Sequence, residues 1–129
     1  MIRVLSVNVA RAARCAIGQR EVMTAFGKQP VAGAVAVRAL GLAGDEQADR
    51  SVHGGLAKSV YAYPHEHYAF WQTVRAQAQA QAWDAALPHG MLGENLTLTG
   101  LLEGDAWIGD VLRFPDCTLA ISEPRHPCY

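Results

Sequence analysis

Short apolar segments separated by glycine and proline constrain the fold of this chain more than any other feature of its sequence. Most are rich in Val, Leu and Ile and only a few residues long, which is typical of short β-strands. None approaches the run of about 20 apolar residues that a membrane-spanning helix needs. We expect strands at residues 2–9, 21–26, 31–40, 59–63, 95–99, 110–114 and 117–122, and a loop at 10–20.

One segment, residues 64–86, has the spacing of an amphipathic helix. Tyr68, Trp71 and Val74 recur at helical intervals, and the alanines and glutamines that follow favour a helix. Pro64 is expected at the first helical position, where its missing N–H costs nothing. Many short strands with one helix predict a mainly β (α+β) fold with a twisted or barrel-like sheet.

The composition excludes several classes of protein. A length of 129 residues predicts one domain, and a hydrophobic content of 50% excludes a disordered tail. The formal net charge of -1 offers no broad basic surface, so we expect neither nucleic acid nor a membrane as a partner. The N-terminal segment lacks the apolar core of a signal peptide. Three cysteines without a CxxC pair favour a reducing compartment, and hence a cytoplasmic location.

Cys128 has the most informative surroundings of the three cysteines, in the sequence SEPRHPCY. A thiol reacts or binds metal as the thiolate, which adjacent cations favour. Arg125 and His126 are such neighbours, and two prolines restrict the backbone around them. From these residues alone, a functional thiol and an inert terminal cysteine both remain open. The other two cysteines are expected to be structural.

The segment 41–55, GLAGDEQADRSVHGG, is a long polar loop with four glycines. Consecutive glycines let main-chain N–H groups converge on an anion. Arg50, His53 and Lys58 are the cations that would add charge to such a site. The alternative is an ordinary turn in which Asp45 and Asp49 cap nearby backbone groups. The loop carries no Walker or dinucleotide-binding motif, so the pattern alone does not decide between the two.

Glu94 and Asn95 are the other polar candidates, in the glycine-flanked segment GMLGENLTLTG. They either satisfy buried backbone groups or point into a pocket. His65 and His67 are two residues apart and do not share a helix face, so a zinc pair there is not expected. A serine hydrolase is not supported because the chain has no GxSxG motif.

Taken together, these segments resemble the MOSC domain, the module at the C-terminus of molybdenum-cofactor sulfurases, and in particular its stand-alone YiiM-like members. The resemblance extends over nearly the whole chain, and its segments follow in the family's order. They are KQPV (28–31), GLAGDEQADRSVHGG (41–55), YAYPHEHYAFW (61–71), GMLGENLTLTGL (90–101), WIGDVLRF (107–114) and ISEPRHPCY (121–129).

The resemblance implies a MOSC-type twisted β-barrel, like that of pyruvate kinase, with one main helix. The family's chain continues beyond its characteristic cysteine, which Cys128 matches, whereas this sequence stops at Tyr129. We therefore expect 1–129 to be a fragment or a shortened MOSC domain that lacks the family's C-terminal part. An incomplete barrel is consistent with that expectation.

The same resemblance implies a cofactor and a set of site residues. Cys128 would either ligate the molybdenum of a bound molybdopterin cofactor or carry sulfur as a persulfide. Asn95 and Glu94 would orient the substrate or handle protons. No pyridoxal phosphate is expected, because that cofactor belongs to a desulfurase domain absent here. The residues expected to hold the cofactor and its phosphate, in a pocket shared with Cys128, are Lys28, Arg50, His53, Gly54, Gly55, Lys58 and Arg125.

The implied activity is reduction of N-hydroxylated compounds, such as hydroxylaminopurines, to amines. The expected partners are therefore a small N-hydroxylated substrate and an electron-donating reductase, and a homodimer is left open. A second hypothesis is a sulfur carrier that holds a persulfide on Cys128. A third is a non-catalytic chain that binds a partner through an unfinished sheet.

We predict that Cys128 is the reactive thiol, because only this cysteine has both cationic neighbours and a proline frame. Mild alkylation at neutral pH, followed by mass mapping, should label Cys128 before Cys15 and Cys117. The pH dependence of labelling separates reactivity from mere exposure near a chain end. Equal labelling of all three thiols would contradict the assignment.

Overall fold

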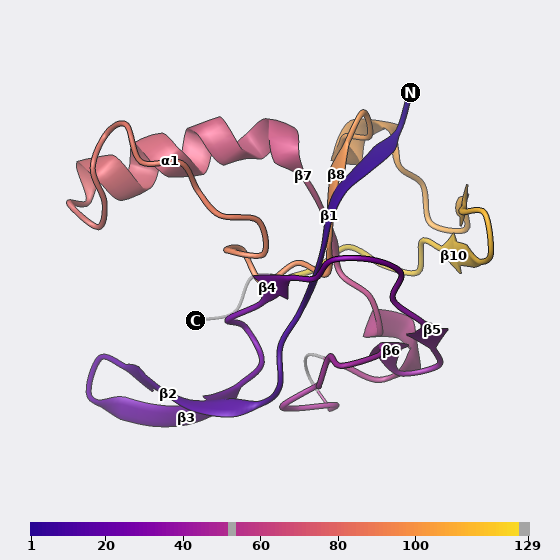
Figure 1. Ribbon diagram of the computed structural model, residues 1–129, viewed down its shortest axis with the longest axis horizontal. Coiled ribbons are helices and arrows are strands. Elements are labelled where there is room, and N and C mark those ends of the chain that lie inside the picture. Colours follow the sequence, from indigo (N-terminus) through magenta and orange to yellow (C-terminus); the bar gives the residue numbers. More distant parts are fainter. Residues whose placement is uncertain (52–53, 127–129) are drawn as a thin grey trace.

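A four-stranded sheet forms the centre of the fold in the computed structural model, which describes residues 1–51 and 54–126 (Figure 1). Its strand order is β4-β1-β8-β7, with β1 antiparallel to both of its neighbours and β7 parallel to β8. A parallel pair needs a long crossover connection, and the one between β7 and β8 contains the main helix, α1. The bounds are β1 Arg3–Val9, β4 Gln29–Pro30, β7 Ala62–Pro64, β8 Leu96–Thr99 and α1 Tyr68–Gln77.

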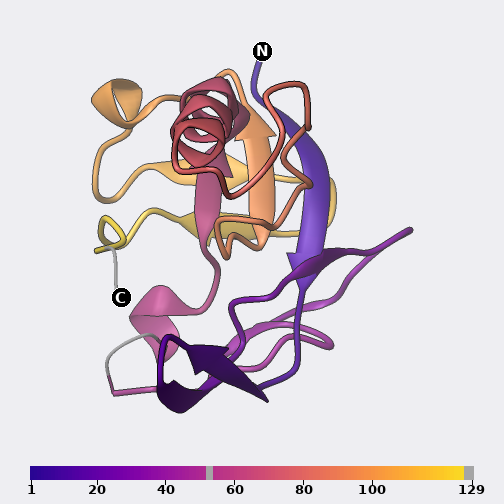
Figure 2. The same ribbon diagram turned by 90° about the vertical axis from the view of Figure 1, so that its left-hand side faces the viewer.

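Three antiparallel two-stranded sheets surround this central sheet, and in Figure 2 the helix α1 is seen nearly along its axis. The fold is thus mainly β with one main helix, as expected, and the described residues form no closed barrel. Within these residues, no helix is long and apolar enough to cross a membrane. The remaining elements are β2 Ala13–Ile17, β3 Arg20–Thr24, β5 Val37–Arg38, β6 Gly41–Leu42, β9 Val111–Arg113, β10 Thr118–Ala120 and the 3-10 helices Leu56–Lys58, His65–His67 and Glu103–Asp105.

The expected loop at 10–20 is wrong, because this segment begins a β-hairpin. Strand β2 pairs with β3 from Ala13↔Thr24 to Ile17↔Arg20. Gly18, at φ +62, allows the tight turn between the two strands. Conversely, the strand expected over 31–40 is reduced to Val37 and Arg38.

The helix is also shorter than the expected 64–86. Pro64 ends β7 in an extended conformation rather than opening the helix. At the other end, Gln79 adopts a left-handed conformation at φ +57. Its N–H donates to the carbonyl of Ala76, and the N–H of Ala80 donates to the carbonyl of Arg75. This pair of bonds is a Schellman motif, which satisfies the last carbonyls and ends the helix.

The apolar core is small and lies against β8. Leu96 and Leu98 alternate with polar residues along this strand and pack with Leu42 from β6. Partly buried side chains around them come from five further segments: Val7, Val9, Val35, Val60, Leu112, Phe114 and Leu119. Among the described residues, the largest fully buried side chains are nevertheless polar: Glu94, Asn8 and Thr97. The interior therefore depends on hydrogen bonding as well as on apolar packing.

Replacing Leu98, which is 3% exposed, by alanine should remove side-chain contacts at the centre of this core. We expect the free energy of unfolding to fall by about 2–5 kcal/mol, the usual range for a buried Leu→Ala change. Urea denaturation measures the effect. The matched control is Leu56→Ala, because Leu56 is 73% exposed and should change stability by less than about 0.5 kcal/mol. Equal midpoints for both variants would contradict the assignment of the core.

Candidate functional site

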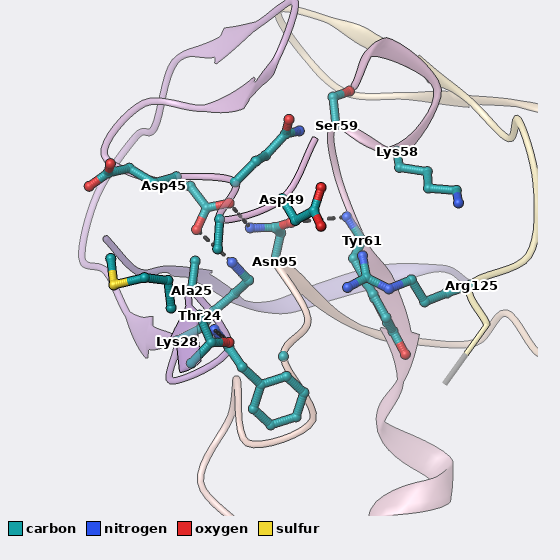
Figure 3. A pocket seen from close by; sticks show the side chains of 16 residues that line it. Thr24, Ala25, Lys28, Asp45, Asp49, Lys58, Ser59, Tyr61, Asn95 and Arg125 are labelled. Carbon is teal, nitrogen blue, oxygen red and sulfur yellow. Dashed lines mark hydrogen bonds and ion pairs between the residues drawn. The ribbon is translucent and has the colours of Figure 1, made fainter. Parts of the chain in front are cut away.

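A cavity of about 110 Å³ lies where the base of the β2–β3 hairpin, the 45–49 loop and the segment just before β8 approach one another (Figure 3). Its walls bring together segments that are distant in the sequence. The lining residues are 23–26, Lys28, 45–49, Lys58, Ser59, Tyr61, Gly93, Asn95 and Arg125. Four of the residues expected at the site therefore lie around one cavity: Lys28, Lys58, Asn95 and Arg125.

A buried ion pair forms one wall of this cavity. The Nζ atom of Lys28 lies 2.7 Å from Oδ1 of Asp45, and the two side chains are only 8% and 6% exposed. The same Oδ1 accepts a hydrogen bond of 2.8 Å from the backbone N–H of Ala10. Asp45 therefore connects the loop to β1 and to the segment before β4, and it neutralises the Lys28 ammonium.

Asn95 binds the second oxygen of the Asp45 carboxylate, the one that Lys28 does not contact. Its Nδ2 donates to Oδ2 of Asp45 at 2.9 Å and to the carbonyl of Asn8 at 3.1 Å. Its Oδ1 accepts the backbone N–H of Tyr61 at 3.0 Å. The Asn95 side chain thus holds three segments together, and its polar atoms are engaged within the protein. Its position in the cavity wall is fixed by these bonds.

Glu94 lies beside Asn95 in the sequence but does not line the cavity. Its carboxylate is fully buried and accepts hydrogen bonds from the Tyr68 hydroxyl and, at 2.9 Å, from the Thr97 hydroxyl. Two backbone N–H groups, of Gly90 and Leu92, also donate to it at 3.1 Å each. Burial and the bond to Glu94 raise the pKa of Tyr68. Glu94 therefore satisfies buried donors and fixes the turn that places Gly93 at the cavity.

Two further cations lie at the other edge of the cavity (Figure 3). The guanidinium of Arg125 lies over the ring of Tyr61, 4.8 Å from its centroid, in a cation–π contact. Burial raises the pKa of Tyr61 to about 12, although Arg125 opposes this shift. The phenol is therefore neutral at physiological pH and does not cancel the charge of Arg125. Lys58 pairs with Glu123 at 3.6 Å, with both side chains partly exposed to solvent.

The glycine-rich loop is braced by a side chain that the sequence did not single out, Gln47. Its Oε1 accepts the N–H of Gly55 at 2.9 Å. A Cβ at Gly54 would lie 2.5 Å from the same oxygen, so a larger residue cannot fit there without displacing the Gln47 side chain. The N–H of Gly55 is thus engaged within the loop, and neither glycine lines the cavity.

The turn interpretation of this loop is correct for Asp49, whose Oδ1 accepts the N–H of Ser51 at 2.9 Å. Asp45 instead makes long-range contacts. Arg50 is exposed and does not line the cavity. The remaining two site residues expected from the sequence, His53 and Cys128, lie outside the described residues.

The charges and the size of the cavity determine which part of a molybdopterin cofactor the described residues could bind. Lys28 is neutralised by Asp45, whereas Arg125 keeps its charge. A cationic edge suits the phosphate of the cofactor. The volume of about 110 Å³ is below the roughly 300 Å³ at which pockets for whole ligands begin. Within the described residues, no three His, Cys, Asp or Glu side chains are grouped to hold a metal ion.

Replacing Asp45 by alanine should leave the Lys28 ammonium buried without a counter-charge. Removing one partner of a buried ion pair typically lowers stability by about 3–5 kcal/mol. Chemical denaturation tests this expectation. The control is Glu46→Ala in the same loop, since the Glu46–Arg11 pair spans 3.8 Å at the surface and contributes at most about 1 kcal/mol. A loss for Asp45→Ala no larger than that for Glu46→Ala would contradict the structural role of the buried pair.

Three proteins with related sequences match most of this chain. It is 36% identical over 125 residues to "Uncharacterized protein YflK" of Bacillus subtilis, covering 97% of this chain and 53% of that protein. It is 39% identical over 106 residues to "Protein YiiM" of Escherichia coli, covering 82% and 45%. A protein named "Reductase" from Gibberella moniliformis is 36% identical over 126 residues, covering 97% of this chain and 21% of that protein. The chain thus spans about half the length of the first two relatives.

The fold has a similar counterpart among solved structures. The crystal structure of YiiM from Geobacillus stearothermophilus superposes with a TM-score of 0.67 at 30% identity, covering 99% of this chain and 53% of that chain. The MOSC domain family matches residues 49–129, more than half of the sequence. The match includes the 3-10 helix at Leu56–Lys58, strands β7 and β8 and the segment that carries Arg125. The chain therefore belongs to the MOSC domain family, as a YiiM-like member.

Proposed function

We propose that this chain binds the molybdenum cofactor in a reductase of N-hydroxylated compounds. The observation that carries the proposal is the cationic edge formed by Arg125 and Lys58. Arg125 precedes Cys128 by three residues in the sequence, and three residues of chain span at most about 11 Å. A cation for an anionic cofactor and a thiol for its metal therefore belong to one short segment. The MOSC family is associated with this cofactor in general.

In this proposal Arg125 and Lys58 bind the phosphate of the cofactor, and Tyr61 keeps the guanidinium of Arg125 oriented toward it. Asn95 and the Lys28–Asp45 pair hold the opposite wall in place through their mutual hydrogen bonds. Cys128 provides a thiolate, a ligand that suits a soft metal centre. Glu94 positions the turn before β8 rather than exchanging protons, because its oxygens already accept four hydrogen bonds.

The reaction consumes two electrons and two protons: R–NHOH + 2e⁻ + 2H⁺ gives R–NH₂ and water. When bound, the cofactor supplies the two-electron chemistry at the N–O bond. The electrons come from a separate donor, for which an electron-donating reductase is the proposed partner. The protein named "Reductase" from Gibberella moniliformis supports an oxidoreductase role, because a segment of this kind makes up 21% of its length.

A second candidate function is a sulfur carrier with a persulfide on Cys128. The observation that favours it is the small volume of the cavity, about 110 Å³, which suits a sulfur atom and a small acceptor better than a whole pterin. In this case the persulfide transfers its outer sulfur to an acceptor, and the thiol is restored. The cationic edge would then stabilise the thiolate that leaves.

The cofactor content of the protein, purified from a cell that makes molybdopterin, separates the two candidates. For the reductase we expect molybdenum and pterin to co-purify. Cys128→Ser should lose molybdenum, and Arg125→Ala should weaken cofactor retention by about tenfold, as expected for the loss of one charge-assisted contact. Cys117→Ser is the matched control, since Cys117 precedes β10 and does not line the cavity.

Turnover of a hydroxylaminopurine with a chemical reductant provides the second measurement. Loss of molybdenum in Cys128→Ser without loss of fold would support thiolate ligation. A protein without molybdenum whose mass shows one added sulfur atom on Cys128 would replace the reductase with the sulfur carrier. Full activity in Cys128→Ser would contradict ligation of the metal by this thiol.

A further inference from the structure

The β2–β3 hairpin extends from the rest of the molecule (Figure 1). Every residue of β2 is exposed, and neither strand packs extensively against another helix or strand. The hairpin forms a two-stranded sheet of its own, separate from the central sheet. Because an isolated two-stranded hairpin is only marginally stable in water, such an arm gains most from a partner that covers it.

The arm carries a local positive charge. Arg14 and Arg20 are exposed, and among the described residues neither makes an ion pair. Glu21 is the one acidic residue in either strand. The chain as a whole has a net charge of -1, so this excess of positive charge is a property of the arm and not of the molecule. Arginine without an internal partner is a residue type enriched at protein interfaces.

Each face of the arm combines an arginine with an exposed apolar side chain. The cross-strand register places Arg14 opposite Met23 on one face and Ile17 opposite Arg20 on the other. Met23 is 56% exposed and Ile17 is 50% exposed. Methionine and arginine beside apolar groups favour a protein partner, in which these side chains become desolvated, over the repeating phosphates of nucleic acid.

The base of the arm is part of the cavity wall. Met23 and Thr24, at the end of β3, line the same cavity as Arg125 and Lys58. A protein bound along the arm would therefore lie next to this cavity. This is the geometry required of a donor that passes electrons to a group held there.

We propose that the β2–β3 hairpin is the docking site for an acidic electron-donor protein, and this inference rests on the proposed reductase function. The donor clasps the arm from both sides: its carboxylates pair with Arg14 on one face and with Arg20 on the other, and Met23 and Ile17 supply the apolar contact on those same faces. The donor gives up the two electrons that the reduction of R–NHOH consumes. The donor class is an acidic flavoprotein or iron–sulfur protein, because such proteins carry one or two electrons and complement the charge of the arm.

The test is a charge reversal, Arg14→Glu with Arg20→Glu, and the probes are a flavodoxin and a [2Fe–2S] ferredoxin, both acidic. We expect saturable binding of at least one probe to the unaltered protein at about 50 mM salt, weakened by at least about tenfold in the variant. Binding should also weaken steeply toward about 500 mM salt, as exposed charges become screened. The matched control is Arg38→Glu with Arg113→Glu, which changes the net charge equally at two exposed residues of β5 and β9.

Two activity measurements separate this inference from the function on which it rests. Reduction of a hydroxylaminopurine is followed with dithionite and, separately, with the protein donor. If the arm docks the donor, the arm variant retains the dithionite rate and loses at least about tenfold with the protein donor, whereas the control pair retains both. Absence of activity with dithionite in the unaltered protein would overturn the proposed function instead.

The docking inference itself is overturned by any of three results. The first is that neither probe binds the unaltered protein at low salt. The second is that the arm variant and the control pair bind a probe equally well. The third is binding of a single-stranded oligonucleotide more tightly than either probe, with loss of that binding in the arm variant. That result would assign the arginines to nucleic acid.

Discussion

The burial of the Lys28–Asp45 pair sets the constraint that the rest of this structure satisfies. Removing two charges from water is unfavourable unless the remaining polar atoms of both groups find partners. Ala10 and Asn95 donate hydrogen bonds to the Asp45 carboxylate. The Lys28 ammonium donates to one oxygen of the same carboxylate at 2.7 Å. Each of these partners comes from a different segment. The pair is therefore stable only when the end of β1, the 45–49 loop and the segment just before β8 are all in place.

A small apolar core makes this dependence stronger. Within the described part of the chain, three leucines of β6 and β8 form its buried centre, while the largest fully buried side chains are Glu94, Asn8 and Thr97. Nδ2 of Asn8 donates to Thr97 and to the carbonyl of Glu94 at 3.1 Å each, which links β1 to β8 beside the leucines. Apolar packing alone would allow these elements to slide, whereas directed bonds fix one register. The cavity inherits this rigidity, because Asn95 belongs to the same network.

The sequence predicts the elements that have strong local signals and misses those that depend on distant partners. Ile2–Val9 is rich in β-branched and aliphatic residues, and β1 was predicted almost to the residue. The β2 strand was missed because alanine and arginine have weak strand preferences, so that Gly18 and its turn carried the only clear signal. The helix end depends on Gln79 in a left-handed conformation, which residue type alone does not indicate.

The same distinction applies to the candidate site. Lys58, Asn95 and Arg125 could be proposed because charged and amide side chains in such segments are candidates for binding, whereas Lys28 was implied by the resemblance to the MOSC family. The partner of Asp45 could not be deduced, since Lys28 is 17 residues away and Asn95 is 50 residues away in the sequence. The role of Gln47 could not be deduced either. Its amide oxygen accepts the N–H of Gly55, eight residues further along the chain, and this N–H was expected to bind an anion.

The three cations of the cavity differ in how much charge each can offer to a ligand. Lys28 is held by a buried carboxylate at 2.7 Å, so an incoming anion would have to compete with a desolvated ion pair. Lys58 meets Glu123 at 3.6 Å with both side chains partly exposed, and such a contact exchanges readily with solvent and ligands. Arg125 is held by the face of Tyr61, which orients the guanidinium without neutralising it. In the proposed function, Arg125 and Lys58 are therefore the cations expected to meet the anion, while Lys28 maintains the wall of the cavity.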